Sequence, residues 1–235
     1  MKLIINCLCL VLILSLSCQI QAANRFWVSA TPSNWNNTAN WSNVSGGAGG
    51  FSVPAAGDAV TFNNVRRGNC TIDIPVNITD LTINAGYTGT IIQGAHTIII
   101  SDDAVLSAGQ FLGGSSNITI SGNFTLSGTN FTSTSATLQI DGDPAFNSGV
   151  FTHNNGTVKF NATGTTNISG TSPTFFTLEF VGNGFNYNIN STGNIRVTNS
   201  LNVSGTSTYN LNTGDIDVTG NINITNTAAG ASGSA

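Results

Sequence analysis

Rows of twenty residues repeat along the middle of the chain. The row that begins at Asn117 reads NITISGNFTLSGTNFTSTSA, and rows in the same register begin at Thr97, Thr137 and Thr157. Apolar residues fill fixed columns of these rows, namely Ile98, Ile118, Leu138 and Val158 at the second position, and Phe111, Phe131 and Phe151 at the fifteenth. Column identity at a fixed period is the signature of a repeat architecture, and it limits the fold more than any other feature.

Within each row, apolar and polar residues alternate, which indicates short strands rather than a helix. Turn residues interrupt each row at two places, such as Gly122-Asn123 and Ser127-Gly128, and a third Gly/Ser/Asn-rich turn closes it. Three strands and three corners in about twenty residues predict one triangular coil. We therefore predict an all-β chain, a right-handed parallel β-helix (β-solenoid) whose coils stack about 4.8 Å apart.

The alternative architecture is a β-sandwich of antiparallel hairpins, in which short strands also recur every 8 to 12 residues or so. A sandwich does not require residues twenty positions apart to match. The matching columns therefore favour the solenoid.

The chain carries little charge: of 235 residues, 6 are Lys or Arg and 10 are Asp or Glu. A stacked parallel array explains this scarcity, because a charge repeated in an outward column would lie one strand spacing from its neighbour. The longest basic run is Arg66-Arg67. We therefore expect neither nucleic acid nor an anionic membrane surface as a partner.

Residues 1–22 have the layout of a secretory signal peptide: Lys2, an apolar run from Leu8 to Leu16, and small residues near Ala22. Cleavage after Ala22 is the preferred prediction, and it places the mature chain outside the cell or on its surface. A membrane anchor is the alternative, but the apolar run is short for a bilayer. A lipobox-like Leu16-Ser17-Cys18 leaves lipidation of Cys18 open.

Residues 23–69 differ in texture from the repeats and contain all three tryptophans, Trp27, Trp35 and Trp41. The first coil of a solenoid exposes a strand edge and an apolar end, so we predict that residues 23–69 form a cap together with the first strands. A candidate glycan contact at the three indoles is the alternative. Residues 70–226 are predicted to be solenoid repeats, and residues 227–235 a flexible tail.

The opening NWNNTANWS…VPAAGDAVTF, followed by NCTIDIPVNITDLTI and GVFTHNNGTVKF, resembles secreted bacterial β-solenoid repeat proteins. The coil length and the Asn/Gly/Thr texture are similar to those of filamentous haemagglutinin and autotransporter adhesins. This resemblance implies a surface-exposed, adhesive protein. Unlike those families, the chain to Ala235 shows no barrel, sorting signal or wall anchor, which leaves open whether it is a fragment.

Right-handed β-helices also include polysaccharide lyases and hydrolases, which need paired carboxylates or a Ca²⁺-bound carboxylate cluster. The chain has one glutamate, Glu179, and none of its basic residues falls in register with a carboxylate group large enough to form a cleft. The best cluster is the corner column Asp103, Asn123 and Asp143, with Asp102 and Asp141 beside it. Tolerance of a tight turn explains these residues more simply than Ca²⁺ does.

Cys70 is the one cysteine outside the leader, so no disulfide framework is expected. It lies in the alternating run NCTIDIPVNI, which predicts a small buried hydrophobe rather than a nucleophile. His96 and His153 fall at different phases of the repeat and form no zinc set with it. The sequence predicts no catalytic residue, no cofactor and no metal.

These observations together predict an exported, non-enzymatic structural or adhesive solenoid. Its expected partners are extracellular polysaccharides or cell-surface glycans and proteins. A polysaccharide-binding or polysaccharide-cleaving protein on the same scaffold is the alternative.

Overall fold

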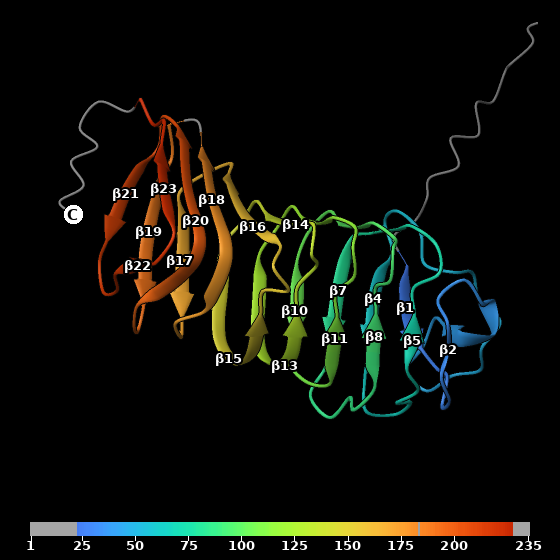
Figure 1. The fold of residues 1–235 in the computed structure, drawn as a ribbon. Coiled ribbons are helices and arrows are strands. Elements are labelled where there is room, and N and C mark those ends of the chain that lie inside the picture. Colours follow the sequence, from blue (N-terminus) through green and yellow to red (C-terminus); the bar gives the residue numbers. More distant parts are fainter. Residues whose placement is uncertain (1–22, 183, 228–235) are drawn as a thin grey trace, which may run out of the picture.

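The computed structural model describes residues 23–182 and 184–227, and these residues form a parallel β-solenoid of about eight turns (Figure 1). The coils contain about 21 residues each, so the predicted period is confirmed. Strand pairing is parallel throughout, except where the first strand meets a short antiparallel neighbour near the N-terminal end. The antiparallel sandwich is thereby excluded. The signal-peptide prediction lies outside the described residues.

The strands form two sheets. The larger sheet contains β1 (Asn24–Trp27), β2 (Ser33–Asn34), β3 (Trp41–Ser42), β4 (Ala59–Phe62), β5 (Cys70–Thr71), β7 (Asp80–Ile83), β8 (Thr90–Ile92), β10 (Ala104–Leu106), β11 (Gln110–Leu112), β13 (Phe124–Thr132), β15 (Pro144–Thr152), β17 (Thr166–Gly170), β19 (Asn186–Ser191) and β21 (Thr208–Leu211). The smaller sheet contains β6 (Val76–Ile78), β9 (Ile98–Ile100), β12 (Ile118–Ile120), β14 (Thr137–Ile140), β16 (Thr157–Ala162), β18 (Thr174–Gly182), β20 (Ile195–Gly205), β22 (Ile216–Val218) and β23 (Asn221–Ile224). A short 3-10 turn covers Thr38–Asn40.

Each central coil has three sides, as predicted. One coil runs through β9, β10 and β11, and the next begins with β12 on top of β9. Strands β13 and β15 each run through two sides without a break, which joins those sides into the larger sheet. Paired residues are 20 apart in the centre, as for Ile118 and Leu138, and 21 to 23 apart in the last coils, as for Ile195 with Ile216 and Thr177 with Ser200, so the later coils are slightly longer.

The three phenylalanines of the fifteenth column form a single file. Phe111 pairs with Phe131 and Phe131 with Phe151, with ring centroids 5.0 and 5.9 Å apart and interplanar angles of 17° and 20°. The second column stacks in the same way, because Ile98, Ile118 and Leu138 face one another across β9, β12 and β14. The predicted register is confirmed in both columns.

Buried side chains form one continuous core along the axis, from Trp27 to Val203. The core is closed at the N-terminal end, where β3 lies antiparallel against β1. The last strands are more open: Leu211, Ile222 and Ile224 are 55%, 57% and 64% exposed.

A buried amide holds one corner of the solenoid. The Gln93 side chain is fully buried and donates from Nε2 to the carbonyls of His96 and Ser116 at 3.0 and 2.8 Å. Its Oε1 accepts the amide of Gly114 at 2.8 Å. All three bonds go to backbone groups, so this side chain replaces water inside the corner.

Candidate functional site

The three tryptophans lie together over the N-terminal end of the core. Trp27 contacts Trp41 edge-on with centroids 5.2 Å apart, and Trp41 contacts Trp35 at 4.7 Å. Phe62 of β4 packs against all three, and stacks on Trp27 at 5.6 Å. The Nε1 groups of Trp27 and Trp41 donate to the carbonyls of Gly68 and Trp35.

This arrangement is that of a cap. Trp27, Trp35 and Trp41 are 1%, 1% and 0% exposed, and edge-to-face contacts between the rings add to the area they bury. No indole face is open to a sugar ring. The structure therefore does not support the candidate glycan contact at these residues, because the apolar end of the core already occupies their faces.

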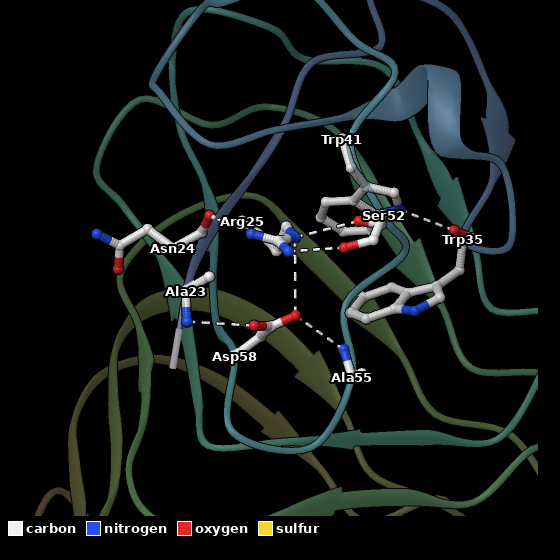
Figure 2. A network of polar contacts seen from close by, with 8 residues as sticks. All are labelled: Ala23, Asn24, Arg25, Trp35, Trp41, Ser52, Ala55 and Asp58. Carbon is white, nitrogen blue, oxygen red and sulfur yellow. Dashed lines mark hydrogen bonds and ion pairs between the residues drawn. The ribbon is translucent and has the colours of Figure 1, made fainter. Parts of the chain in front are cut away.

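A charged network ties the start of β1 to the loop before β4 (Figure 2). One oxygen of Asp58 accepts the Ala23 amide at 3.2 Å. The other accepts the Ala55 amide at 3.0 Å and lies 3.7 Å from Nε of Arg25. Arg25 also donates to the carbonyl and hydroxyl of Ser52. Asp58 is buried, so its charge is compensated by these fixed donors rather than by water.

The corner column that was weighed as a Ca²⁺ cluster binds backbone amides of the neighbouring coil instead. Oδ1 of Asp103 accepts the Asn123 amide at 2.7 Å, and Oδ1 of Asn123 accepts the Asp143 amide at 2.9 Å. Oδ1 of Asp143 continues the series to the Asn167 amide at 2.8 Å. Each side chain therefore satisfies a backbone N–H of the next coil. In the described part of the chain, no group of three or more His, Cys, Asp or Glu side chains is arranged to hold a metal.

The hydrogen bond from the Asn123 amide to Asp103 predicts how substitutions of Asp103 change the stability of the protein. Asp103→Asn keeps an acceptor for the Asn123 amide and should leave the free energy of unfolding within about 0.5 kcal/mol. Asp103→Ala removes the acceptor and should cost about 1 kcal/mol. Chemical denaturation measures both. If millimolar Ca²⁺ raised the melting temperature of the unmodified chain but not of Asp103→Ala, the column would be a metal site after all.

Cys70 is fully buried, which confirms its interpretation as a small core residue. Burial, and secondarily the nearby Asp73 carboxylate, raises the pKa of the Cys70 thiol well above its usual range. The thiolate that a nucleophile needs is thus disfavoured. His96 and His153 lie partly exposed outside the core, and Nδ1 of His153 accepts the Asn155 amide at 3.0 Å.

A hollow of about 220 Å³ opens beside β15. It forms because β17 pairs with β15 only through Ala145 and Phe146, so among the described strands none is hydrogen-bonded to the far end of β15 on the side of the next coil. Leu126, Phe146 and Phe151 line its apolar part, and Ser148, Thr171 and Thr174 its hydroxyl-bearing part. Sequence reasoning missed this hollow. Its signal lies within the row at Thr157, where Thr166 and Thr171 replace the apolar residues of the tenth and fifteenth columns.

An outward row of amides runs across consecutive coils of β17, β19 and β21. Nδ2 of Asn210 donates to Oδ1 of Asn188 at 2.9 Å, and Nδ2 of Asn188 donates to Oδ1 of Asn167 at 3.0 Å. The row ends on Asp143, whose Oδ2 accepts Nδ2 of Asn167 at 3.2 Å. We call Asn167, Asn188 and Asn210 the amide row. Two further Asn–Asn hydrogen bonds, each joining only two coils, link Asn212 to Asn190 and Asn223 to Asn202.

Comparison with known proteins gives no relative. No family model, curated protein or solved structure matches this chain. The similarity to haemagglutinin and adhesin passengers therefore has no support beyond the solenoid itself, which the structure shows. Among the described residues, no helix has the length and apolar character needed to cross a membrane.

Proposed function

We propose that this chain is an exported, non-enzymatic β-solenoid that serves as a structural and adhesive element at the cell surface or in the extracellular matrix. The amide row carries the proposal. It holds identical polar groups in a fixed line, one per coil, and the hydrogen bonds between coils hold their spacing. A line of weak contacts at regular spacing suits a polymer that carries its own repeated hydroxyl groups, because linked contacts reinforce one another.

The low charge of the chain supports a neutral ligand. Neutral polysaccharide offers hydroxyl groups, which amides and hydroxyls can bind, and does not require compensating charge. Adhesion of this kind should persist at about 0.5 M salt, where attraction between exposed charges is largely screened.

A second candidate function is a discrete polysaccharide-binding module at the hollow beside β15. The hollow favours it because apolar side chains and hydroxyl groups lie side by side there, a combination typical of ligand sites. Binding at the hollow would depend on a few residues, whereas binding along the amide row is spread over several coils.

One experiment separates the two functions. The intact protein is sedimented with insoluble neutral polysaccharides, such as cellulose and chitin, at low and high salt. Replacing all of Asn167, Asn188 and Asn210 by Ala should weaken binding at least tenfold, and Asn188→Ala alone about fivefold or less. Val150→Arg, which projects a long side chain at the hollow, should leave binding unchanged.

If Val150→Arg abolished binding and the triple Asn→Ala variant kept it, the ligand site would be the hollow. Binding to none of the polymers would overturn the adhesive proposal. Release of sugar fragments during the incubation, with or without Ca²⁺, would overturn the non-enzymatic one. Secretion is measured separately, from the fraction of the expressed chain recovered outside the cytoplasm.

A further inference from the structure

The buried carboxylate of Asp58 lies against the first residue after the expected cleavage point. Ala23 is held on both sides: its amide donates to Oδ1 of Asp58 at 3.2 Å, and its carbonyl accepts the Ala59 amide at 3.0 Å. The residue therefore has a fixed place beside β4, and its nitrogen points at an anion (Figure 2).

The loop before β4 keeps this carboxylate in position. The Asp58 amide donates to the Ala55 carbonyl at 3.0 Å, and Oδ2 of Asp58 accepts the Ala55 amide. Gly57, with a φ of 91°, makes the turn between them. Arg25 lies on the Oδ2 side, which leaves Oδ1 directed at the Ala23 nitrogen.

We propose that hydrolysis of the peptide bond between Ala22 and Ala23 creates an α-ammonium group that forms an ion pair with the buried carboxylate of Asp58. The inference rests on the export part of the proposed function. A signal peptidase supplies the catalysis and water the second reactant. The carbonyl carbon of residue 22 takes the hydroxyl of water, the Ala23 nitrogen takes the remaining hydrogen, and the proton that the new carboxyl group loses converts the amine to an ammonium. A neutral one-hydrogen donor becomes a cation with three donors at the same place.

The ion pair would couple processing to folding. Before cleavage the Asp58 carboxylate has one full cation, Arg25, at 3.7 Å, and after cleavage it has two. Charge-assisted hydrogen bonds are about twice as strong as neutral ones. The mature chain is thus expected to hold β1 on the solenoid more firmly than the precursor does. Lipidation of Cys18 predicts a different outcome, because it would leave the Ala23 nitrogen as an amide.

The first measurement is the intact mass of the exported product of the full chain. It should begin at Ala23 and carry no lipid. The second is its equilibrium stability. Inserting one glycine between Ala22 and Ala23 moves the amine one residue away from Asp58 and restores the amide. We expect the folding equilibrium constant to fall about tenfold on insertion, but less than twofold when Asp58→Asn is already present.

Amine labelling provides a readout that does not require the Asp58→Asn variant to fold. The product should contain two amines, the α-amine and Lys159, because Lys2 is removed with the leader. In a Lys159→Arg background the α-amine alone reacts with an acylating reagent. It should react about tenfold more slowly than the amine of the glycine-insertion chain, since only the unprotonated form reacts and Asp58 favours the protonated one.

A product that begins elsewhere, or that carries lipid on Cys18, overturns the inference. So do equal labelling rates, or an insertion effect that is the same with and without Asp58. The same chain released at Ala23 by cutting an N-terminal fusion gives the stability result without export. Failure of export or of polysaccharide binding is thereby distinguished from failure of the ion pair.

Discussion

Phe131→Ala should lower the free energy of unfolding by about 3–5 kcal/mol. Phe131 is 3% exposed and lies in the middle of the phenylalanine file, stacked between Phe111 and Phe151. It also meets the edge of Phe124 at 5.4 Å. Truncation leaves a cavity that the coils above and below cannot close, because their spacing is set by backbone hydrogen bonds.

The effect is measured by denaturant unfolding. Val150→Ala is the matched control, since Val150 lies on the neighbouring strand β15, is 55% exposed, and should change stability by less than about 0.5 kcal/mol. Because each coil contacts mainly its neighbours, the loss could also split the transition into two steps. A Phe131→Ala chain as stable as the Val150→Ala chain would contradict the stacked core.

Gly114→Ala should cost about 3 kcal/mol, although only one methyl group is added. Gly114 lies at a corner where successive coils approach closely: a Cβ there would be 1.6 Å from the carbonyl oxygen of Gly94 in the coil before. That oxygen accepts the Ser115 amide at 3.0 Å, and the Gly114 amide itself donates to the buried Gln93 side chain. Relief of the clash therefore disturbs two bonds of the corner.

Gly164→Ala is the control, because a Cβ at Gly164 would meet nothing within 4 Å. It should be neutral or slightly stabilising, since alanine restricts the unfolded chain. Thermal unfolding of the two variants is compared under identical conditions. If both alanines had the same small effect, the coils would be further apart at this corner than the structure places them.

Most of the fold could be predicted from the twenty-residue period of the sequence. Residues one coil apart, such as Ile118 and Leu138, occupy the same column in the sequence and in the sheet, since parallel stacking allows no other arrangement of matched rows. The triangular coil followed from the two interrupting turns and was also confirmed.

The sites were harder to predict than the fold. The acceptor role of Asp103 is invisible in one row, because it depends on a backbone N–H of the next coil. The partners Arg25 and Asp58 lie far apart in a stretch that has no repeat to align them. The hollow beside β15 arises where the pairing of consecutive coils fails, and a pattern method detects only where it succeeds.

The amide row gives the rod a direction. All three side chains donate toward the N-terminal end, and Asn188 and Asn167 also accept from the C-terminal side. The small dipoles of the three amides therefore add rather than cancel, and the row ends at the carboxylate of Asp143. The surface of these coils, which belongs to a chain with few charged residues, thus has a positive-to-negative sense along the solenoid axis. Two such rods laid side by side would therefore differ in energy between the head-to-head and head-to-tail arrangements.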